Sequence, residues 1–231
     1  MLTLDKLLIK QGDFHLSADL SIPAGARVAV IGPSGAGKST LLSVIAGFLA
    51  PSQGRVLWHG KDITQTDPGA RPLSILFQAQ NLFPHLSVTR NLALGLNPDG
   101  KVDAPDHARI ETALIRAGLE GMGARKPGQL SGGQQSRAAL ARALLRARPM
   151  LLLDEPFAAL GPALKAEMLA LVAQIAREQG TTVLMVSHDP EDARALCPQT
   201  VLVADGVALA PQDTETLLNA PPPSLRAYLG A

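Results

Sequence analysis

Short apolar segments alternate along the chain with longer segments whose apolar residues recur every three or four positions. The first pattern is typical of buried strands, and the second of helices that pack on one face. The strands predicted in this way are residues 27–31, 55–58, 73–77, 150–153, 182–186 and 200–204. Strands that alternate with helices favour a mostly parallel sheet covered by helices, so we expect an α/β fold.

The middle of the chain has a different pattern. Residues 87–147 carry helical periodicity and few strand signals, with long helices expected at 105–118 and 135–147. We therefore predict one domain, in which a helical subdomain (87–148) is inserted into an α/β core formed by 1–86 and 149–231. A further helix is expected at 162–179, with a core-facing stripe, and a short one at the C-terminal end. The stripe consists of Leu164, Met168, Leu171, Val172 and Ile175.

Composition excludes several classes of protein. The chain is 46% apolar, yet it has no uncharged apolar stretch of about 18 residues that would span a membrane. It has 21 Lys and Arg against 20 Asp and Glu, and few aromatic residues, which argues against a nucleic-acid-binding surface. The one cysteine, Cys197, and an N-terminus without signal-peptide layout fit a cytosolic protein.

The segment after the first predicted strand is a candidate phosphate site. It fits the pattern G-x-x-x-x-G-K-[ST] between a strand and a helix expected at 38–49. Glycines let backbone N–H groups turn toward a phosphate, and the helix N-terminus adds partial positive charge. Lys38 should reach the β- and γ-phosphates of ATP, Ser39 should bind Mg²⁺, and Thr40 adds a donor. The full set is Gly32, Pro33, Ser34, Gly35, Ala36, Gly37, Lys38, Ser39 and Thr40.

An acidic pair follows a second buried strand. Asp154 and Glu155 come directly after the apolar residues 150–153. Asp154 should emerge near the phosphate site and hold Mg²⁺ through water. Glu155 would then be placed to polarise the attacking water.

A third glycine-containing segment precedes the helix expected at 135–147. Ser131, Gly132, Gly133 and Gln134 could form a second anion site at a helix N-terminus. The alternative is a loop in which Ser131 simply caps the helix. Two phosphate-binding helix ends in one chain favour a head-to-tail homodimer, in which this segment contacts the ATP held by the other subunit.

These segments together resemble the ATP-binding subunits of ABC transporters. Walker A corresponds to 32–40, the signature to 130–134 and Walker B to 151–155, in the family's order. The resemblance implies a P-loop NTPase core with an N-terminal antiparallel β part. It also implies that Gln78 contacts Mg²⁺ and the attacking water, and that His188 contacts the γ-phosphate. The implied catalytic residues are Lys38, Gln78, Glu155 and His188, and the implied metal-binding residues are Ser39, Gln78 and Asp154.

Two segments depart from the family pattern. Where the family usually reads Ser-Ala-Leu-Asp after Walker B, the chain has Ala158, Ala159, Leu160 and Gly161. The strength of ATP hydrolysis is therefore left open, and a nucleotide-binding regulator that hydrolyses ATP weakly is an alternative. Gln11 stands where an aromatic residue usually stacks on adenine, with Phe14 and His15 as the nearby candidates.

Within the family, residues 41–51, 71–88 and 94–98 are most similar to thiamine importers. The resemblance implies a subunit that uses ATP and Mg²⁺, dimerises when ATP is bound and lies on the cytoplasmic face of the inner membrane. Its partners would be a permease and, indirectly, a periplasmic solute-binding protein, with no nucleic acid. Iron(III), polyamine or sulfate import is the alternative. A soluble family member acting in DNA repair or on ribosomes would need a coiled-coil insertion or a second ATP module.

The apolar stretch at 81–86 has two interpretations. It could form an exposed groove for a permease helix, or it could pack inside the helical subdomain.

Overall fold

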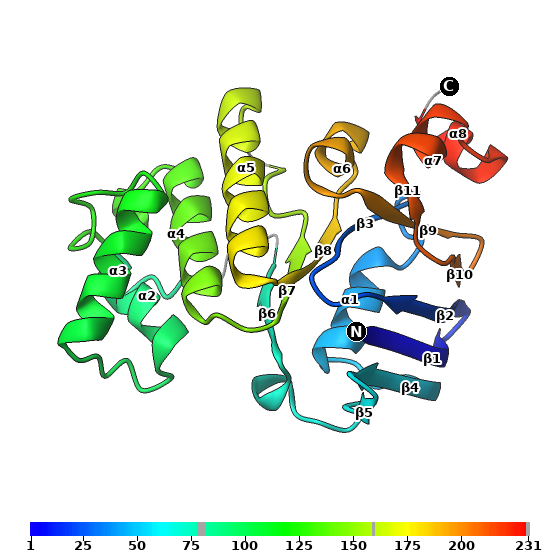
Figure 1. Ribbon diagram of the computed structural model, residues 1–231, viewed down its shortest axis with the longest axis horizontal. Coiled ribbons are helices and arrows are strands. Elements are labelled where there is room, and N and C mark those ends of the chain that lie inside the picture. Colours follow the sequence, from blue (N-terminus) through cyan, green and yellow to red (C-terminus); the bar gives the residue numbers. More distant parts are fainter. Residues whose placement is uncertain (78–81, 159, 230–231) are drawn as a thin grey trace.

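The computed structural model describes residues 1–77, 82–158 and 160–229, which form an α/β structure (Figure 1). The strands are β1 (Leu2–Gln11), β2 (Phe14–Ile22), β3 (Arg27–Ile31), β4 (Gln53–Trp58), β5 (Lys61–Asp62), β6 (Leu73–Leu76), β7 (Met150–Asp154), β8 (Thr182–Val186), β9 (Gln199–Ala204), β10 (Val207–Ala208) and β11 (Gln212–Asp213). The α-helices are α1 (Lys38–Ala46), α2 (Val88–Leu96), α3 (Ala104–Arg116), α4 (Gly132–Leu145), α5 (Pro162–Gln179), α6 (Pro190–Leu196), α7 (Thr214–Asn219) and α8 (Pro223–Leu229). Two 3₁₀ turns lie at Pro68–Ala70 and Pro127–Gln129.

The described strands form one sheet in the order β5-β4-β1-β2-β10-β9-β3-β8-β7-β6, with β11 beside β9. From β9 to β6 the neighbours are parallel. At the other end β1, β2, β4 and β5 pair antiparallel. The predicted parallel core and N-terminal antiparallel part are both confirmed. All six strands expected from the apolar segments are present.

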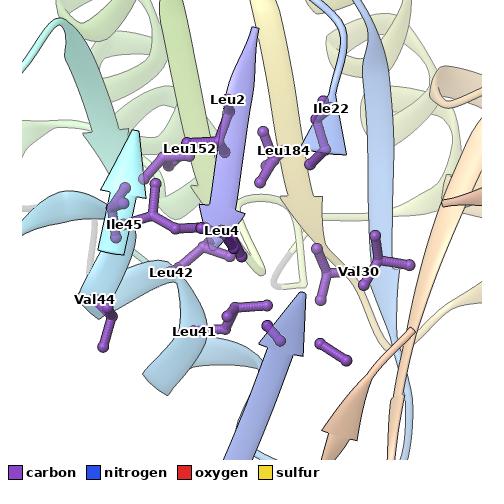
Figure 2. Close-up of a cluster of buried hydrophobic side chains, with 14 of the residues drawn as sticks. Leu2, Leu4, Ile22, Val30, Leu41, Leu42, Val44, Ile45, Leu152 and Leu184 are labelled. Carbon is purple, nitrogen blue, oxygen red and sulfur yellow. The ribbon is translucent and has the colours of Figure 1, made fainter. Parts of the chain in front are cut away.

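Helix α1, which follows the candidate phosphate loop, is buried between the antiparallel and parallel parts of the sheet. Figure 2 shows Leu41, Leu42 and Ile45 among side chains of β1, β2, β3, β7 and β8. The three leucine and isoleucine side chains are at most 2% exposed. Because both parts of the sheet hold α1, the start of this helix has a fixed position.

The C-terminal end of α1 is held by a buried arginine. Gly47 ends the helix with a left-handed φ of 88°, so α1 stops at Ala46 rather than at residue 49. Arg71 is 1% exposed and donates to the carbonyl oxygens of Val44 (2.9 Å) and Ile45 (2.7 Å). Its guanidinium also donates to the carbonyls of residues 64 and 66. It thus gives a donor to the Ile45 carbonyl at the helix end and a second donor to the Val44 carbonyl, which also accepts from the N–H of Gly47.

Helices α2, α3 and α4 share a buried apolar cluster of their own, and we call these three helices the helical subdomain. Figure 1 shows them together at one side of the molecule, in green. Helix α4 begins at Gly132, three residues before the expected start, because Ser131 caps it. None of the helices in the described ranges is long and apolar enough to cross a membrane.

Helix α5 has the bounds expected from its apolar stripe, and Met168, Val172 and Ile175 are at most 5% exposed. The terminal helix α8 is confirmed. The short helices α6 and α7 were not predicted.

Candidate functional site

The candidate phosphate loop runs from Gly32, at the end of β3, to the start of α1, and two of its glycines are required by close packing. A Cβ on Gly32 would lie 1.9 Å from the carbonyl oxygen of Val203. A Cβ on Gly37, whose φ is 99°, would lie 2.6 Å from Cζ of Phe14. The loop therefore fits against β9 and the Phe14 ring only because both positions lack side chains.

The Lys38 ammonium lies at this loop. The residue is 8% exposed, and its Nζ donates to the carbonyl oxygens of Gly32 (2.7 Å) and Pro33 (2.8 Å). Burial lowers the pKa of Lys38, whereas the negative charges of Glu155 and Asp154 act in the opposite direction. A buried cation is thus placed between the glycine-containing loop and the acidic pair.

The loop and the acidic strand meet through Ser39 and Asp154. The Ser39 hydroxyl donates to Oδ1 of Asp154 at 2.9 Å, although 115 positions separate the two residues. Burial raises the pKa of Asp154, and the Glu155 charge adds to this, whereas the Ser39 hydrogen bond and the Lys38 charge lower it. Two oxygen ligands therefore lie together at the start of α1, which suits a hard divalent cation. Within the described ranges, no group of three or more His, Cys, Asp or Glu could hold a metal by itself.

Glu155 has a strained backbone and lies beside His188. Its φ is 46°, in the left-handed region that favours glycine, and its N–H donates to the carbonyl of Val186 at 3.1 Å. Strain of this kind is concentrated at functional sites. The Nδ1 atom of His188 lies 3.4 Å from Oε2 of Glu155. The structure thus brings together two residues that the sequence analysis singled out separately.

The segment at 131–134 forms the N-terminal end of α4. The Ser131 hydroxyl accepts from the N–H of Gln134 (3.3 Å), and the Gln134 side chain accepts from the N–H of Ser131 (2.9 Å). This is a capping box. A Cβ on Gly133 would lie 2.8 Å from Cδ2 of Leu164 on α5. The capping interpretation is confirmed, and it leaves the anion-site interpretation standing as a prediction.

Several candidates take less part in the described site. Gln78 and Ala159 lie outside the described residues. Gln11 and His15 are exposed, and Phe14 is half-buried against the loop.

One set of contacts beside the site was not anticipated from the sequence. Lys165, in the first turn of α5, contacts Asp189 and Asp192 just after His188, with 2.7 Å between Nζ and Oδ1 of Asp192.

The apolar stretch at 81–86 is divided between packing and exposure. Leu82 is partly buried and packs against two apolar clusters, that of the parallel strands with α5 and that of the helical subdomain. Phe83 is 46% exposed and lines a cavity of about 830 Å³ between β6 and the helical subdomain. The fully buried Asn91 accepts from the N–H of Phe83 (2.8 Å) and donates to its carbonyl (3.1 Å). The packing interpretation is therefore confirmed for Leu82, whereas a groove for a permease helix stays a prediction.

Comparison with known proteins places this site in a family. The family model described as ABC transporter matches residues 16–158, which include the loop, the signature segment and the acidic pair. The chain belongs to the ABC transporter family. It is the ATP-binding protein of such a transporter, an ATPase coupled to transport.

Curated ABC relatives match over the full length of the chain. The chain is 67% identical to a thiamine import ATP-binding protein of Cereibacter sphaeroides, over 100% of both chains. It is 58% identical to the protein of the same name from a Ruegeria species, again over 100% of both. A Salmonella typhimurium protein of that name is 52% identical, over 87% of this chain and 85% of its own.

Solved ABC structures agree with the fold. A dimeric bacterial ABC transporter cassette superimposes with a TM-score of 0.82 and 31% identity, covering 93% of this chain and 99% of the other. The same cassette in a post-hydrolysis dimer with ADP and phosphate gives 0.81 and 31% identity, with the same coverage. The α/β ABC ATPase fold expected from the sequence is thereby confirmed.

Proposed function

We propose that this protein is the ATP-hydrolysing subunit of a thiamine importer. The observation that carries the chemistry is the 2.9 Å hydrogen bond between Ser39 and Asp154, which joins the phosphate loop to the acidic strand. The observation that supports thiamine as the cargo is the 67% identity over the full length to a thiamine import protein. Iron(III), polyamine and sulfate have no comparable support.

The residues of the loop would bind the triphosphate of ATP. Backbone N–H groups of 34–40 and the N-terminus of α1 offer donors and partial positive charge. Lys38 would exchange its carbonyl partners on Gly32 and Pro33 for phosphate oxygens, which bind an ammonium more strongly. Ser39 and Asp154 would hold Mg²⁺, which supplies charge neutralisation at the β- and γ-phosphates when it is bound. Gln78 is a further proposed ligand.

Hydrolysis would be promoted by Glu155 and His188. Glu155 lies directly after Asp154, so its carboxylate can accept a hydrogen bond from water attacking the γ-phosphate. His188, 3.4 Å from Glu155, can orient that carboxylate and donate to the phosphate. Catalysis would consist mainly of positioning and charge stabilisation.

A homodimer in the ATP-bound state would complete each site. The solved cassettes with the same fold are described as dimeric. The N-terminal end of α4, with Ser131, Gly132, Gly133 and Gln134, would face the ATP of the opposite subunit. The partial charge of a helix N-terminus favours such contact with phosphate.

The cavity beside Phe83 would receive a segment of the permease. Its lining combines apolar side chains with three arginines and, among the described residues, no carboxylate. Burial lowers the pKa of both Arg142 and Arg146, and the nearby Arg148 adds to the effect at Arg146. Such cations would gain from an acidic partner. We propose a helix with an apolar face and a carboxylate, belonging to a permease at the cytoplasmic face of the inner membrane. A periplasmic solute-binding protein would act indirectly.

Uptake of labelled thiamine into vesicles tests the assignment. Vesicles containing the protein with its copurified permease should accumulate thiamine when ATP is enclosed, and the Glu155→Gln variant should not. Unlabelled thiamine should compete, whereas iron(III), spermidine and sulfate should not. ATP-dependent uptake of one of those solutes instead would reject thiamine as the cargo.

A further inference from the structure

Lys165 occupies a position that conflicts with ordinary helix preferences. Helix α5 begins at Pro162, and the N–H of Lys165 donates to the carbonyl of its capping residue, Gly161, at 2.9 Å. Lys165 is thus in the first turn, and that turn has no acidic residue. Positive charge near a helix N-terminus is unfavourable. A local conflict of this kind requires a compensating contact, and such positions are often functional.

Two carboxylates compensate for this charge. The Lys165 ammonium contacts Oδ2 of Asp189 and lies 2.7 Å from Oδ1 of Asp192. Asp192 is only 7% exposed, so its charge needs a partner. Burial alone would lower the pKa of Lys165, but its hydrogen bonds to Asp189 and Asp192 outweigh burial and raise it.

The same two carboxylates hold the loop that carries His188. The second oxygen of Asp192 accepts from the Ser187 hydroxyl at 2.7 Å. The second oxygen of Asp189 accepts from the N–H of Glu191 at 3.0 Å, and the N–H of Asp189 donates to the Ser187 hydroxyl at 3.1 Å. His188 therefore lies between Ser187, which donates to the Asp192 carboxylate, and Asp189, and Lys165 binds both of these carboxylates.

Lys165 and the catalytic pair also share a small space. A cavity of about 40 Å³ is lined by Glu155, Lys165, Ser187, His188 and Asp192, among others. The chain leaves this space after Ala158 and returns to it at Lys165. A displacement of the first turn of α5 would accordingly move the loop of His188 relative to Glu155.

The first turn of α5 also contacts the signature segment. Leu164 packs so closely on Gly133 that a Cβ there would lie 2.8 Å from Leu164 Cδ2. Adjacent residues of one helical turn thus contact the N-terminal end of α4 and the loop of His188.

We propose that Lys165 is a positioning residue for ATP hydrolysis, which holds His188 against Glu155 through Asp189 and Asp192. This inference rests on the proposed roles of Glu155 and His188. Lys165 does not touch ATP in this scheme. It fixes the distance between Glu155, which contacts the attacking water, and His188, which contacts the γ-phosphate, and it makes that distance depend on where the start of α5 lies.

Steady-state ATPase measurements on the full chain test the proposal. Lys165→Met should lower kcat about tenfold or more, because small misplacements of catalytic groups are costly. KM for ATP should stay within about twofold, since the phosphate loop is intact. Lys165→Arg should restore most of kcat, because guanidinium can bind both carboxylates. The control is Arg194→Met, which removes exposed ion pairs on α6 without touching Asp189 or Asp192.

A double-mutant comparison separates positioning from general loss of stability. Asp189→Asn should lower kcat, and combining it with Lys165→Met should add little further loss. An unchanged kcat in Lys165→Met, or no restoration by Lys165→Arg in a folded protein, would overturn the positioning role. A wild-type protein without turnover, or a Glu155→Gln variant with normal turnover, would instead overturn the catalytic roles on which it rests.

Discussion

Ser39 at the start of α1 donates a hydrogen bond to Asp154 at the end of β7, across 2.9 Å. This contact places a hydroxyl and a carboxylate at the point where a phosphate-bound cation would need them. Asp154 is half-buried at this contact, and burial raises the pKa of its carboxyl, which disfavours the ionised form. Function and stability therefore make opposite demands on this residue.

We predict that Asp154→Asn loses ATPase activity and gains stability. Asparagine can still accept the Ser39 hydrogen bond, and the unfavourable burial of a charge is removed. Because the folded-state pKa of this acid is raised, its ionised form destabilises the protein above that pKa. Because Asp154 is only half-buried, solvent screening should keep the gain at or below about 1 kcal/mol at pH 7, which corresponds to at most about 2–4 °C in Tm for a chain of this size. Thermal unfolding with and without Mg-ATP measures both effects, and a lower Tm would contradict the prediction.

Glu155→Gln should lower the turnover of ATP by about 100-fold or more, because a carboxylate that accepts from the attacking water is lost. ATP binding should survive, and so should dimerisation in the presence of ATP, since the loop and the signature segment are unchanged. Phosphate release and gel filtration with ATP measure the two properties. Normal turnover would show that another group activates the water.

Lys38→Ala should weaken ATP binding, because a buried cation at the phosphate loop is removed. Isothermal titration calorimetry with ATP measures the change, and Lys61→Ala, at an exposed position on β5, serves as the control. An affinity equal to that of the wild type would refute the role of this loop in phosphate binding.

Arg71→Met should destabilise the fold by about 3 kcal/mol, because the carbonyl oxygen of Ile45 at the end of α1 and those of residues 64 and 66 lose the donor that Arg71 provides. Lysine in its place should lose less, since it restores the charge and some of the hydrogen bonds. Urea unfolding monitored by circular dichroism gives the difference. A loss below about 0.5 kcal/mol for Arg71→Met would mean that water satisfies these carbonyls.

Stability should depend on the contact between Lys165 and Asp189 in a pH-dependent way. The hydrogen bond from Lys165 is the main cause that lowers the pKa of Asp189 below its usual 3.8. A lowered carboxyl pKa adds stability above the usual value, and that stability is lost as pH falls through the lowered one. The stability difference between wild type and Lys165→Met should therefore be constant near neutral pH and shrink below about pH 3.8. Urea unfolding over a pH series measures it, and growth of the difference on acidification would contradict the prediction.

Local sequence patterns predicted the parallel strands, α5 and the phosphate loop, because each is encoded within a few consecutive residues. The meeting of Ser39 with Asp154 could be expected because the carboxyl ends of parallel strands share one edge of a sheet. Helices α6 and α7, of 7 and 6 residues, span fewer than two turns, so their apolar positions scarcely repeat.

Arg71 gave no local signal at all. Arginine is ordinarily exposed, and its burial follows only from the tertiary contact between α1 and the segment before β6. Lys165 did carry a local signal, a cation in the first turn of a helix, but the sequence does not tell which carboxylates form ion pairs with it.

The separate apolar cluster of α2, α3 and α4 has a consequence for hydrogen exchange. Because α2 and α3 bury their apolar residues in this cluster, their amides should exchange as one cooperative unit, without prior unfolding of the sheet. The amides of α4 should be protected longer, because Ala139 and Leu140 pack in the cluster of the sheet and α5. A force applied at Phe83 would then move a body that keeps its own shape. The energy of ATP could thus be passed on as rotation of an intact piece rather than being dissipated in local unfolding.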